Sequence, residues 1–208
     1  MLLHVLAAVL AALLVALVVF RDRFLVCSVA RSVVVWGSES AIFDYLAAFE
    51  NTVEWDPNTE KARRVTPARA QPTVGDSFEV TTLLHGRASL TTYQLTHVDR
   101  RSNVRLMLAG ESDSAFLTDT ITLHEEFALD GVERTRVDYK LDVRLKGRMA
   151  PLALLLRPVL EELATTSMDG LVRACARRFG STVRGVQVAD DGIGMPQGGA
   201  HMQGKKES

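Results

Sequence analysis

The 208-residue chain has few of the features that mark metal-binding, disulfide-rich or nucleic-acid-binding proteins. Its two cysteines, Cys27 and Cys175, have no metal-ligand spacing, and we interpret them as small buried residues that need not pair. The formal net charge is −1, so the overall charge balance gives no indication of nucleic-acid binding. The length is sufficient for one domain with a sizeable core.

Motifs that would identify an enzyme or a cofactor are also lacking. His85, His97 and His124 fall on separate predicted strands, and no HExxH pattern or paired cysteine accompanies them, so we predict no metal site. No serine lies in a G-x-S-x-G motif. Gly192 and Gly194 have no strand before them, which argues against dinucleotide binding. We therefore assign no catalytic residue and expect no cofactor.

The first twenty residues form one long apolar run with a single polar side chain, His4. As a helix this run would measure about 30 Å, the thickness of a bilayer's hydrocarbon core. Arg21 and Arg23 follow it, and no basic side chain precedes it, which favours a cytoplasmic location for the remainder. We predict a single-pass transmembrane anchor over residues 1–22. A cleaved signal peptide and a buried soluble helix are the alternatives.

After this run the sequence predicts a strand, two short helical segments and then further strands. Phe24–Trp36 is rich in valine and aromatics, which is typical of a strand. Ser38 resembles an N-cap before a helix over Ala41–Phe49, and Asn51–Asp56 fits another helical turn. Short connections between the strands predict an antiparallel sheet. The further strands expected are Thr59–Thr66, Asp76–His85, Ala88–Val98, Asn103–Ala109, Thr118–Leu129 and Arg136–Lys146.

The last long segment, Ala150–Phe179, carries apolar residues at helical spacing along one face. Pro158 lies inside it and either kinks the helix or begins a second one, and Gly180 is a stop signal. A lone amphipathic helix needs a sheet to cover its apolar face. We therefore predict one α+β domain over residues 23–180, followed by a glycine-rich disordered tail over residues 181–208.

The order of these elements resembles the helix-grip fold of the START-like superfamily, also called SRPBCC, which includes the polyketide cyclase/dehydrase family. The segments that carry the resemblance are Ala41–Pro57, Val74–Phe78 and Asp130–Val137, and it covers about Leu25–Phe179. It implies a curved antiparallel sheet of about seven strands wrapped around the C-terminal helix, with two short helices after the first strand.

The resemblance also implies a function. Proteins of this superfamily bind or transform hydrophobic molecules, so we expect a lipid-like small molecule in an internal cavity, bound or transported at the membrane. A polyketide-cyclase-like enzyme and a protein-interaction module on the same fold are the alternatives. No catalytic motif carries over residue by residue.

Several side chains are candidates for the wall of that cavity. Tyr93 and Tyr139 could offer hydroxyls to a ligand or simply pack. Trp55 could lie in the core or at the pocket mouth. Glu125 shares a strand phase with apolar residues, so its pKa would be raised if that phase faces the cavity; a bulge or a rim position is the alternative. The complete candidate set is Trp55, Phe78, Tyr93, Leu95, Glu125, Phe127, Tyr139, Leu141 and Leu163.

Overall fold

The computed structural model describes residues 26–67, 71–84, 86–101, 104–126, 132–147 and 155–180. The predicted anchor (residues 1–22), the predicted tail (residues 181–208), His85 and Phe127 lie outside the described residues. None of the helices within the described ranges combines the length and the apolar character needed to cross a membrane. The anchor therefore stays a prediction.

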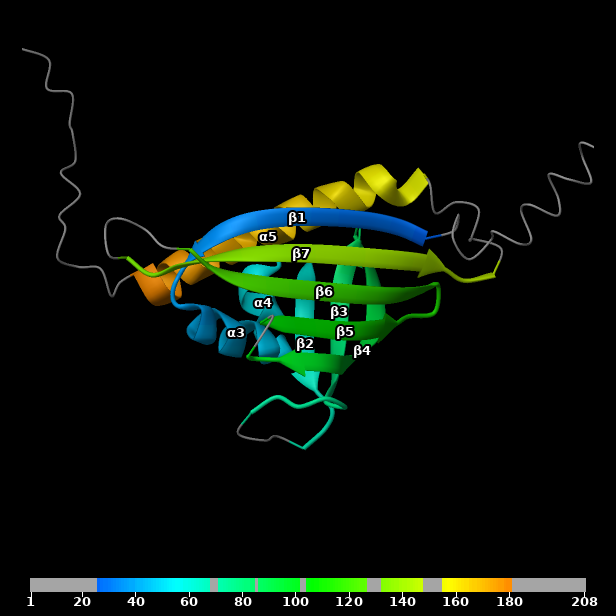
Figure 1. Ribbon diagram of the computed structural model, residues 1–208. Coiled ribbons are helices and arrows are strands. Elements are labelled where there is room, and N and C mark those ends of the chain that lie inside the picture. The colour runs from blue at the N-terminus through cyan, green and yellow to red at the C-terminus, as the bar shows by residue number, and fades with distance from the viewer. Residues whose placement is uncertain are drawn as a thin grey trace, which may run out of the picture.

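One antiparallel sheet of seven strands, in the order β1-β7-β6-β5-β4-β3-β2, forms the larger part of the domain (Figure 1). The helices α3 (Glu39–Ala47), η1 (Phe49–Asn51) and α4 (Thr52–Trp55) follow β1, and α5 (Arg157–Phe179) comes last. The expected α+β helix-grip fold is confirmed. The strands are β1 (Val26–Trp36), β2 (Thr59–Arg64), β3 (Ser77–Leu84), β4 (Arg87–Asp99), β5 (Arg105–Glu111), β6 (Ala115–Glu126) and β7 (Arg134–Leu145).

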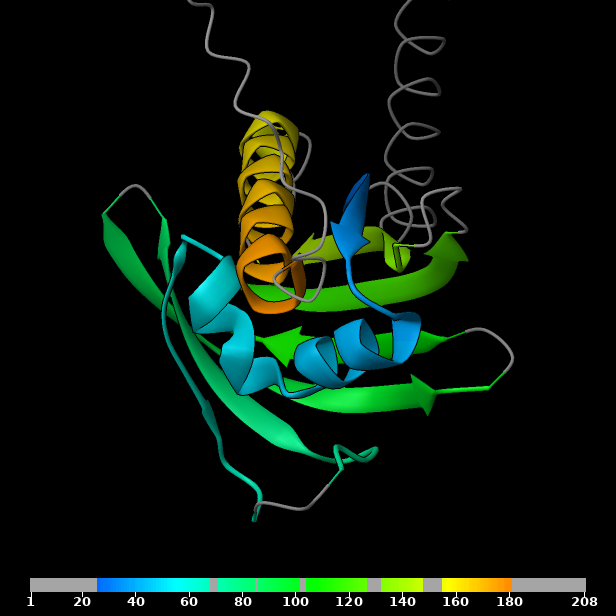
Figure 2. The same cartoon turned by 90° about the vertical axis from the view of Figure 1, so that its left-hand side faces the viewer.

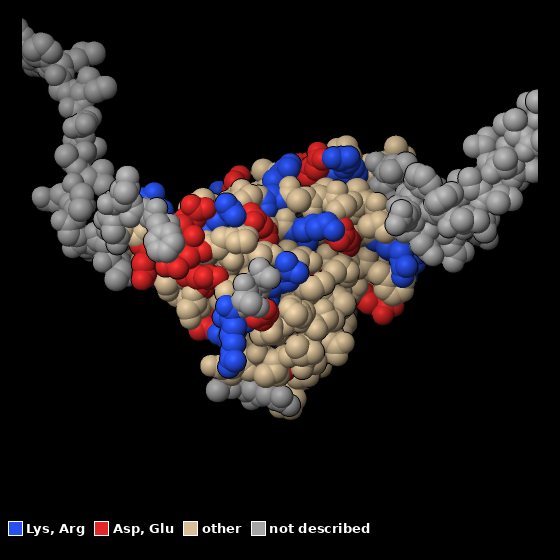
Figure 3. Space-filling view, viewed as in Figure 1, with Lys and Arg blue, Asp and Glu red and all other residues tan. Residues whose placement is uncertain are grey.

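Strand β7 shows how alternation of side chains separates the two faces of the sheet. Leu141, Val143 and Leu145 are buried against the helical side, whereas Lys140 and Arg144, which alternate with them, are exposed on the outer face. Over the outer face, basic and acidic side chains are interspersed around uncharged areas (Figure 3). The concave inner face is therefore the one on which the core is built.

Helix α5 begins at Arg157, so Pro158 lies in its first turn and does not kink it. A proline is well tolerated there because the first backbone N–H groups of a helix have no partner within the helix. The helix ends at Phe179, followed by the stop residue Gly180 that the sequence predicts, and the Gly180 N–H donates to the Ala176 carbonyl. Figure 2 shows the curved sheet wrapping around α5, with α4 beside its C-terminal part.

Two clusters of buried side chains lie between the sheet and the helices. The larger one joins α3, η1 and α4 to β3–β7 and to the C-terminal half of α5, and the smaller one joins β1 and β7 to the N-terminal half of α5. Cys175 belongs to the first cluster and Cys27 to the second, and both are free thiols. The helix thus contacts a different cluster with each of its halves.

Close contact between α4 and α5 fixes the position of the helix over the sheet. Gly170 lies so near the Trp55 carbonyl oxygen that a Cβ atom there would overlap it. Three residues earlier, the Ser167 hydroxyl donates to Asp56 Oδ1 at 2.8 Å. Asp56 also accepts from the Asn58 backbone N–H at 3.0 Å and from the Thr59 hydroxyl at 2.8 Å. One carboxylate therefore joins α5 to the start of β2.

We expect Gly170→Ala to destabilise the domain by about 3 kcal/mol, since the added methyl group must push α5 away from α4. Gly180→Ala is the matched control, because nothing lies within 4 Å of its Cβ position and its φ is −69°. That variant should be neutral or stabilising by about 0.5 kcal/mol. Denaturant unfolding of both variants measures the difference, and equal stabilities would contradict the close approach.

Candidate functional site

A carboxylate lies in the interior of the domain, on the inner face of β6. Asp119 has the same strand phase as Ile121 and Leu123, and its side chain is only 4% exposed. The Tyr139 hydroxyl on β7 donates to Asp119 Oδ1 at 2.5 Å. The Tyr93 hydroxyl on β4 interacts with the same carboxylate. We call Asp119, Tyr139 and Tyr93 the acid–tyrosine cluster.

The strand register brings these three side chains together. Tyr139 is paired with Ile121, so it lies diagonally across from Asp119 on the same face. Tyr93 is paired with Gly110 on β5, and its ring covers that glycine: a Cβ atom at Gly110 would lie 2.6 Å from the ring. The Phe49 ring packs against Tyr93 with centroids 5.1 Å apart. Gly110 and Phe49 together hold Tyr93 in place.

Tyr139 occupies a particular place between the two core clusters. It is half-buried and packs against both of them, whereas Leu163 packs against the smaller cluster and Tyr93 against the larger. All three residues keep some accessible surface, whereas Leu95, two residues after Tyr93, and Ile121, which is paired with Tyr139, are buried. The acid–tyrosine cluster therefore lies where the two parts of the core meet.

Burial governs the electrostatics of this cluster. It raises the pKa of Asp119 to about 6, and the hydrogen bonds from Tyr139 and Tyr93 oppose the rise because they stabilise the charged form. The negative charges of Asp56 and Asp142 raise that pKa further. Burial and the neighbouring Asp119 carboxylate also raise the pKa of Tyr139 and of Tyr93 well above the usual value, so both tyrosines stay protonated.

We expect the stability of the domain to fall as Asp119 ionises. Because the folded-state pKa is about 6 and the reference value is 3.8, the protonated form stabilises the fold below pH 4. That contribution, about 3 kcal/mol, is lost as the pH rises through 6. Asp119→Asn removes the titration, so the unfolding free energy of the variant minus that of the wild type should increase by about this amount between pH 4 and pH 7.5. A constant difference in denaturant unfolding would contradict the buried position of the carboxyl.

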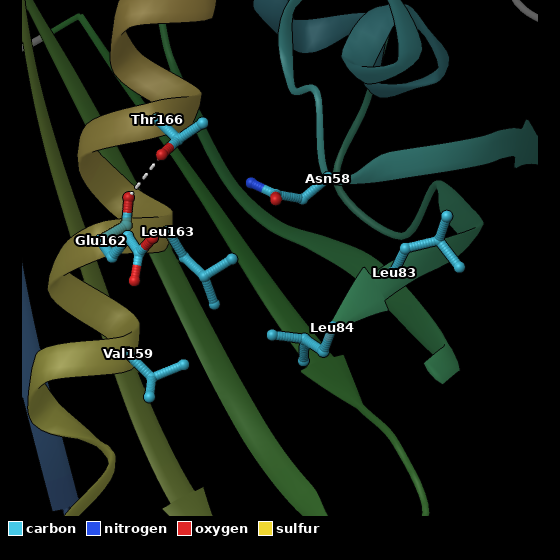
Figure 4. Close-up of a pocket in the computed structure, with 7 residues that line it drawn as sticks. All are labelled: Asn58, Leu83, Leu84, Val159, Glu162, Leu163 and Thr166. Carbon is cyan, nitrogen blue, oxygen red and sulfur yellow. Dashed lines mark hydrogen bonds between the residues drawn. The ribbon is translucent and has the colours of Figure 1, made fainter. Parts of the chain in front are cut away.

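An opening lies between the N-terminal half of α5 and the end of β3. In Figure 4, Val159 and Leu163 project from the helix toward Leu84, and Asn58 projects toward the helix from the other side. The cavity measures about 130 Å³ and is lined by Asn58, Leu83, Leu84, Val159, Glu162, Leu163 and Thr166.

The opening and the acid–tyrosine cluster share neighbours, although none of the three cluster residues lines the opening. The Asn58 side chain donates to Asp56 Oδ1 at 3.1 Å, and the charge of Asp56 acts on the pKa of Asp119. Leu163, at the opening, and Tyr139 also pack against the same core cluster. The opening itself combines leucine and valine side chains with the polar side chains of Asn58, Glu162 and Thr166.

The structure brings together only some of the residues that the sequence suggested for a pocket. Tyr93 and Tyr139 belong to the acid–tyrosine cluster, and Leu163 lines the opening. The remaining described apolar candidates are core residues without contact to the opening: Trp55, Phe78 and Leu95 in the larger cluster and Leu141 in the smaller one.

Glu125 is exposed, although it shares the inward phase of β6 with Leu123. It lies one residue from the C-terminal end of the strand, so the rim position was the better interpretation. The interior carboxyl with a raised pKa is Asp119, which sequence reasoning missed. The signal was present: an aspartate in the phase of Ile121 and Leu123 interrupts an otherwise apolar row.

Histidines and acids do not form a metal centre within the described part of the chain, where no group of three or more metal-ligating side chains is found. His124 Nε2 lies 3.0 Å from Asp138 Oδ2 on the outer face of the sheet. The acid–tyrosine cluster offers hydrogen bonding and proton transfer by one carboxyl and two phenols.

No family model and no curated protein matches this chain. Solved structures with the same fold do match it. A START superfamily protein from Mycobacterium smegmatis is 15% identical, with a TM-score of 0.56, and the match covers 74% of this chain and 98% of that one. The Zhui aromatase/cyclase from Streptomyces sp. R1128 is 16% identical, with a TM-score of 0.56, over 77% of this chain and 97% of that one.

A third structure, TTHA0849 from Thermus thermophilus, is 16% identical with a TM-score of 0.55, over 76% of this chain and 99% of that one. These likenesses extend over nearly the whole of each neighbour. At such low identity they establish the START-like, helix-grip fold and leave the function to be argued from the site.

Proposed function

We propose that the domain binds a hydrophobic small molecule between α5 and the inner face of the sheet. The observation that carries this proposal is the acid–tyrosine cluster, which places a few polar groups in an apolar interior beside an opening. Small-molecule sites commonly have this composition, with apolar walls and a small number of polar groups that fix orientation. The fold neighbours include a START superfamily protein and an aromatase/cyclase, which supports the proposal at the level of the fold.

Leu163→Glu should reduce binding of a fluorescent fatty ligand to the full-length protein at least tenfold, because a charged side chain would replace one of the apolar side chains at the opening. Leu163 is half-buried, so we expect a moderate loss of stability, about 1 kcal/mol. Leu155→Glu is the matched control: Leu155 is 73% exposed, lies two turns earlier and does not line the opening.

Thermal unfolding would show that both variants remain folded. Equal affinities of the two variants would place the ligand elsewhere. Absence of saturable binding by the wild type would favour a protein-interaction module on this fold.

A polyketide-cyclase-like enzyme is the second candidate, and a specific observation favours it. Asp119 has a pKa of about 6, near the range in which a carboxyl can both give and take a proton at neutral pH. The Tyr139 hydroxyl donates a hydrogen bond to it. The two candidates differ in the fate of the ligand. A carrier releases the molecule that it bound, and an enzyme releases a molecule of altered structure, which mass spectrometry of the bound and released material would distinguish.

We further propose that residues 1–22 anchor the domain to a membrane and that the ligand is exchanged with the lipid. Strand β1 begins at Val26, shortly after the apolar run. Cys27 in that strand is close enough to Arg157 and Glu161 for their charges to act on the pKa of its thiol. The start of β1 and the α5 turns beside the opening therefore lie at the same end of the domain, which favours a short path between bilayer and opening.

The anchor can be tested by topology mapping. Because Arg21 and Arg23 follow the apolar run, we expect residues from about 24 onward to face the cytoplasm. A reporter that is active only in the cytoplasm, fused after Ser208, should be active, and the protein should remain in the membrane fraction after a high-salt wash. Activity of a reporter that functions only outside the cytoplasm would contradict this orientation.

A further inference from the structure

We infer that the ligand carries a neutral hydrogen-bond donor, such as a hydroxyl, at its polar end, and that the acid–tyrosine cluster discriminates against carboxylates. This inference rests on the proposed binding function and specifies the class of ligand. It follows from which atoms of the cluster can still accept a hydrogen bond and from the sign of the surrounding charges.

The cluster offers more acceptors than donors. The single hydroxyl proton of Tyr139 is already donated to Asp119 Oδ1, and Tyr93 interacts with the same carboxylate. The second carboxylate oxygen and the lone pairs of the tyrosine oxygens remain as acceptors. A ligand hydroxyl can donate to these atoms, whereas a ligand carboxylate has only acceptors to present to them.

The charges that act on the Asp119 carboxyl are those of Asp56 and Asp142, and both are negative. Asp142 is paired with Lys140 Nζ at 2.7 Å, so Asp56 is the neighbour of Asp119 whose charge is not offset by that lysine. Asp56 is itself held in place by hydrogen bonds from Ser167, Asn58 and Thr59. An anionic group that approached Asp119 would therefore lose its hydration and meet like charges, which is unfavourable in a poorly solvated interior.

The opening suits the other end of such a ligand. Leu83, Leu84, Val159 and Leu163 provide apolar side chains there, and Asn58 at the same opening donates to Asp56. A molecule with an apolar body and one terminal hydroxyl would place each part against groups of matching polarity. An aliphatic alcohol of lipid type and a fused phenol both have this chemistry.

The test uses two matched pairs of probes with the full-length protein at pH 8: 1-decanol with decanoate, and 2-naphthol with 2-naphthoate. Equilibrium dialysis gives the affinity for each probe. Leu163→Glu is measured in parallel, and its binding is subtracted as the binding of the probe at other sites of the protein. We expect the hydroxyl compound of at least one pair to bind at least tenfold more tightly than its carboxylate. The pair with the higher affinity indicates whether the apolar part is lipid-like or aromatic.

Substitution of the carboxylate supplies the decisive control. Asp119→Asn should reduce the preference for the hydroxyl compound to less than threefold, chiefly through tighter binding of the carboxylate. Glu125→Gln removes the same charge from an exposed position on the same strand and should leave the preference unchanged. If probes bind saturably but neither pair shows the preference for the hydroxyl compound, or if the preference is unchanged in Asp119→Asn, the inference is overturned and the binding function is left intact. If no probe binds saturably, both proposals fail.

Discussion

One helix is too narrow to cover a seven-stranded sheet. An α-helix with its side chains is about 11 Å across, whereas seven strands at their usual spacing extend over about 29 Å. Helix α5 packs mainly against β1 and α4, so the middle of the concave face has to be covered in another way. Curvature of the sheet and the short helices α3 and α4 cover part of it. The half-buried side chains Tyr93, Tyr139 and Leu163 lie in the remaining space, which is why the candidate site is found there.

The acid–tyrosine cluster is an unusual way to fill such a space. An apolar side chain at position 119 would continue the row formed by Ile121 and Leu123 and would avoid the cost of burying a carboxyl. Instead, the Asp119 carboxylate depends on Tyr139 and Tyr93 for the hydrogen bonds that water would otherwise supply. Two phenols compensate this carboxylate only partly, since its pKa remains raised. A group that destabilises the fold at neutral pH is better explained by a role in binding or proton transfer than by packing.

Side-chain alternation was sufficient to predict the strands, because a sheet with one solvated face leaves a period of two in its sequence. β7 is the clearest example, and β4 shows where the method weakens: a register shift between Leu95 and His97 breaks the alternation.

The site could be predicted only in part. Of the suggested residues, Tyr93 and Tyr139 contribute to the acid–tyrosine cluster and Leu163 lines the opening, whereas Trp55 and Phe78 are core residues. Which apolar side chain meets the cavity depends on where α5 lies, and no local pattern in the sequence contains that information.

The position of α5 is set at one end and less tightly held at the other. Gly170 allows contact with the backbone of α4, and Met168, Leu171 and Cys175 in the same half of the helix are fully buried. In the other half, Val159 and Leu163 are only half-buried, and these are the residues that line the opening. Leu160 and Ala164 in the same half are buried in the smaller core cluster and hold these turns against β1 and β7. Displacement of the C-terminal turns would break the contact at Gly170, whereas movement of the Val159 and Leu163 side chains alone would not. The opening therefore lies where the helix presents half-buried apolar side chains beside a packed row.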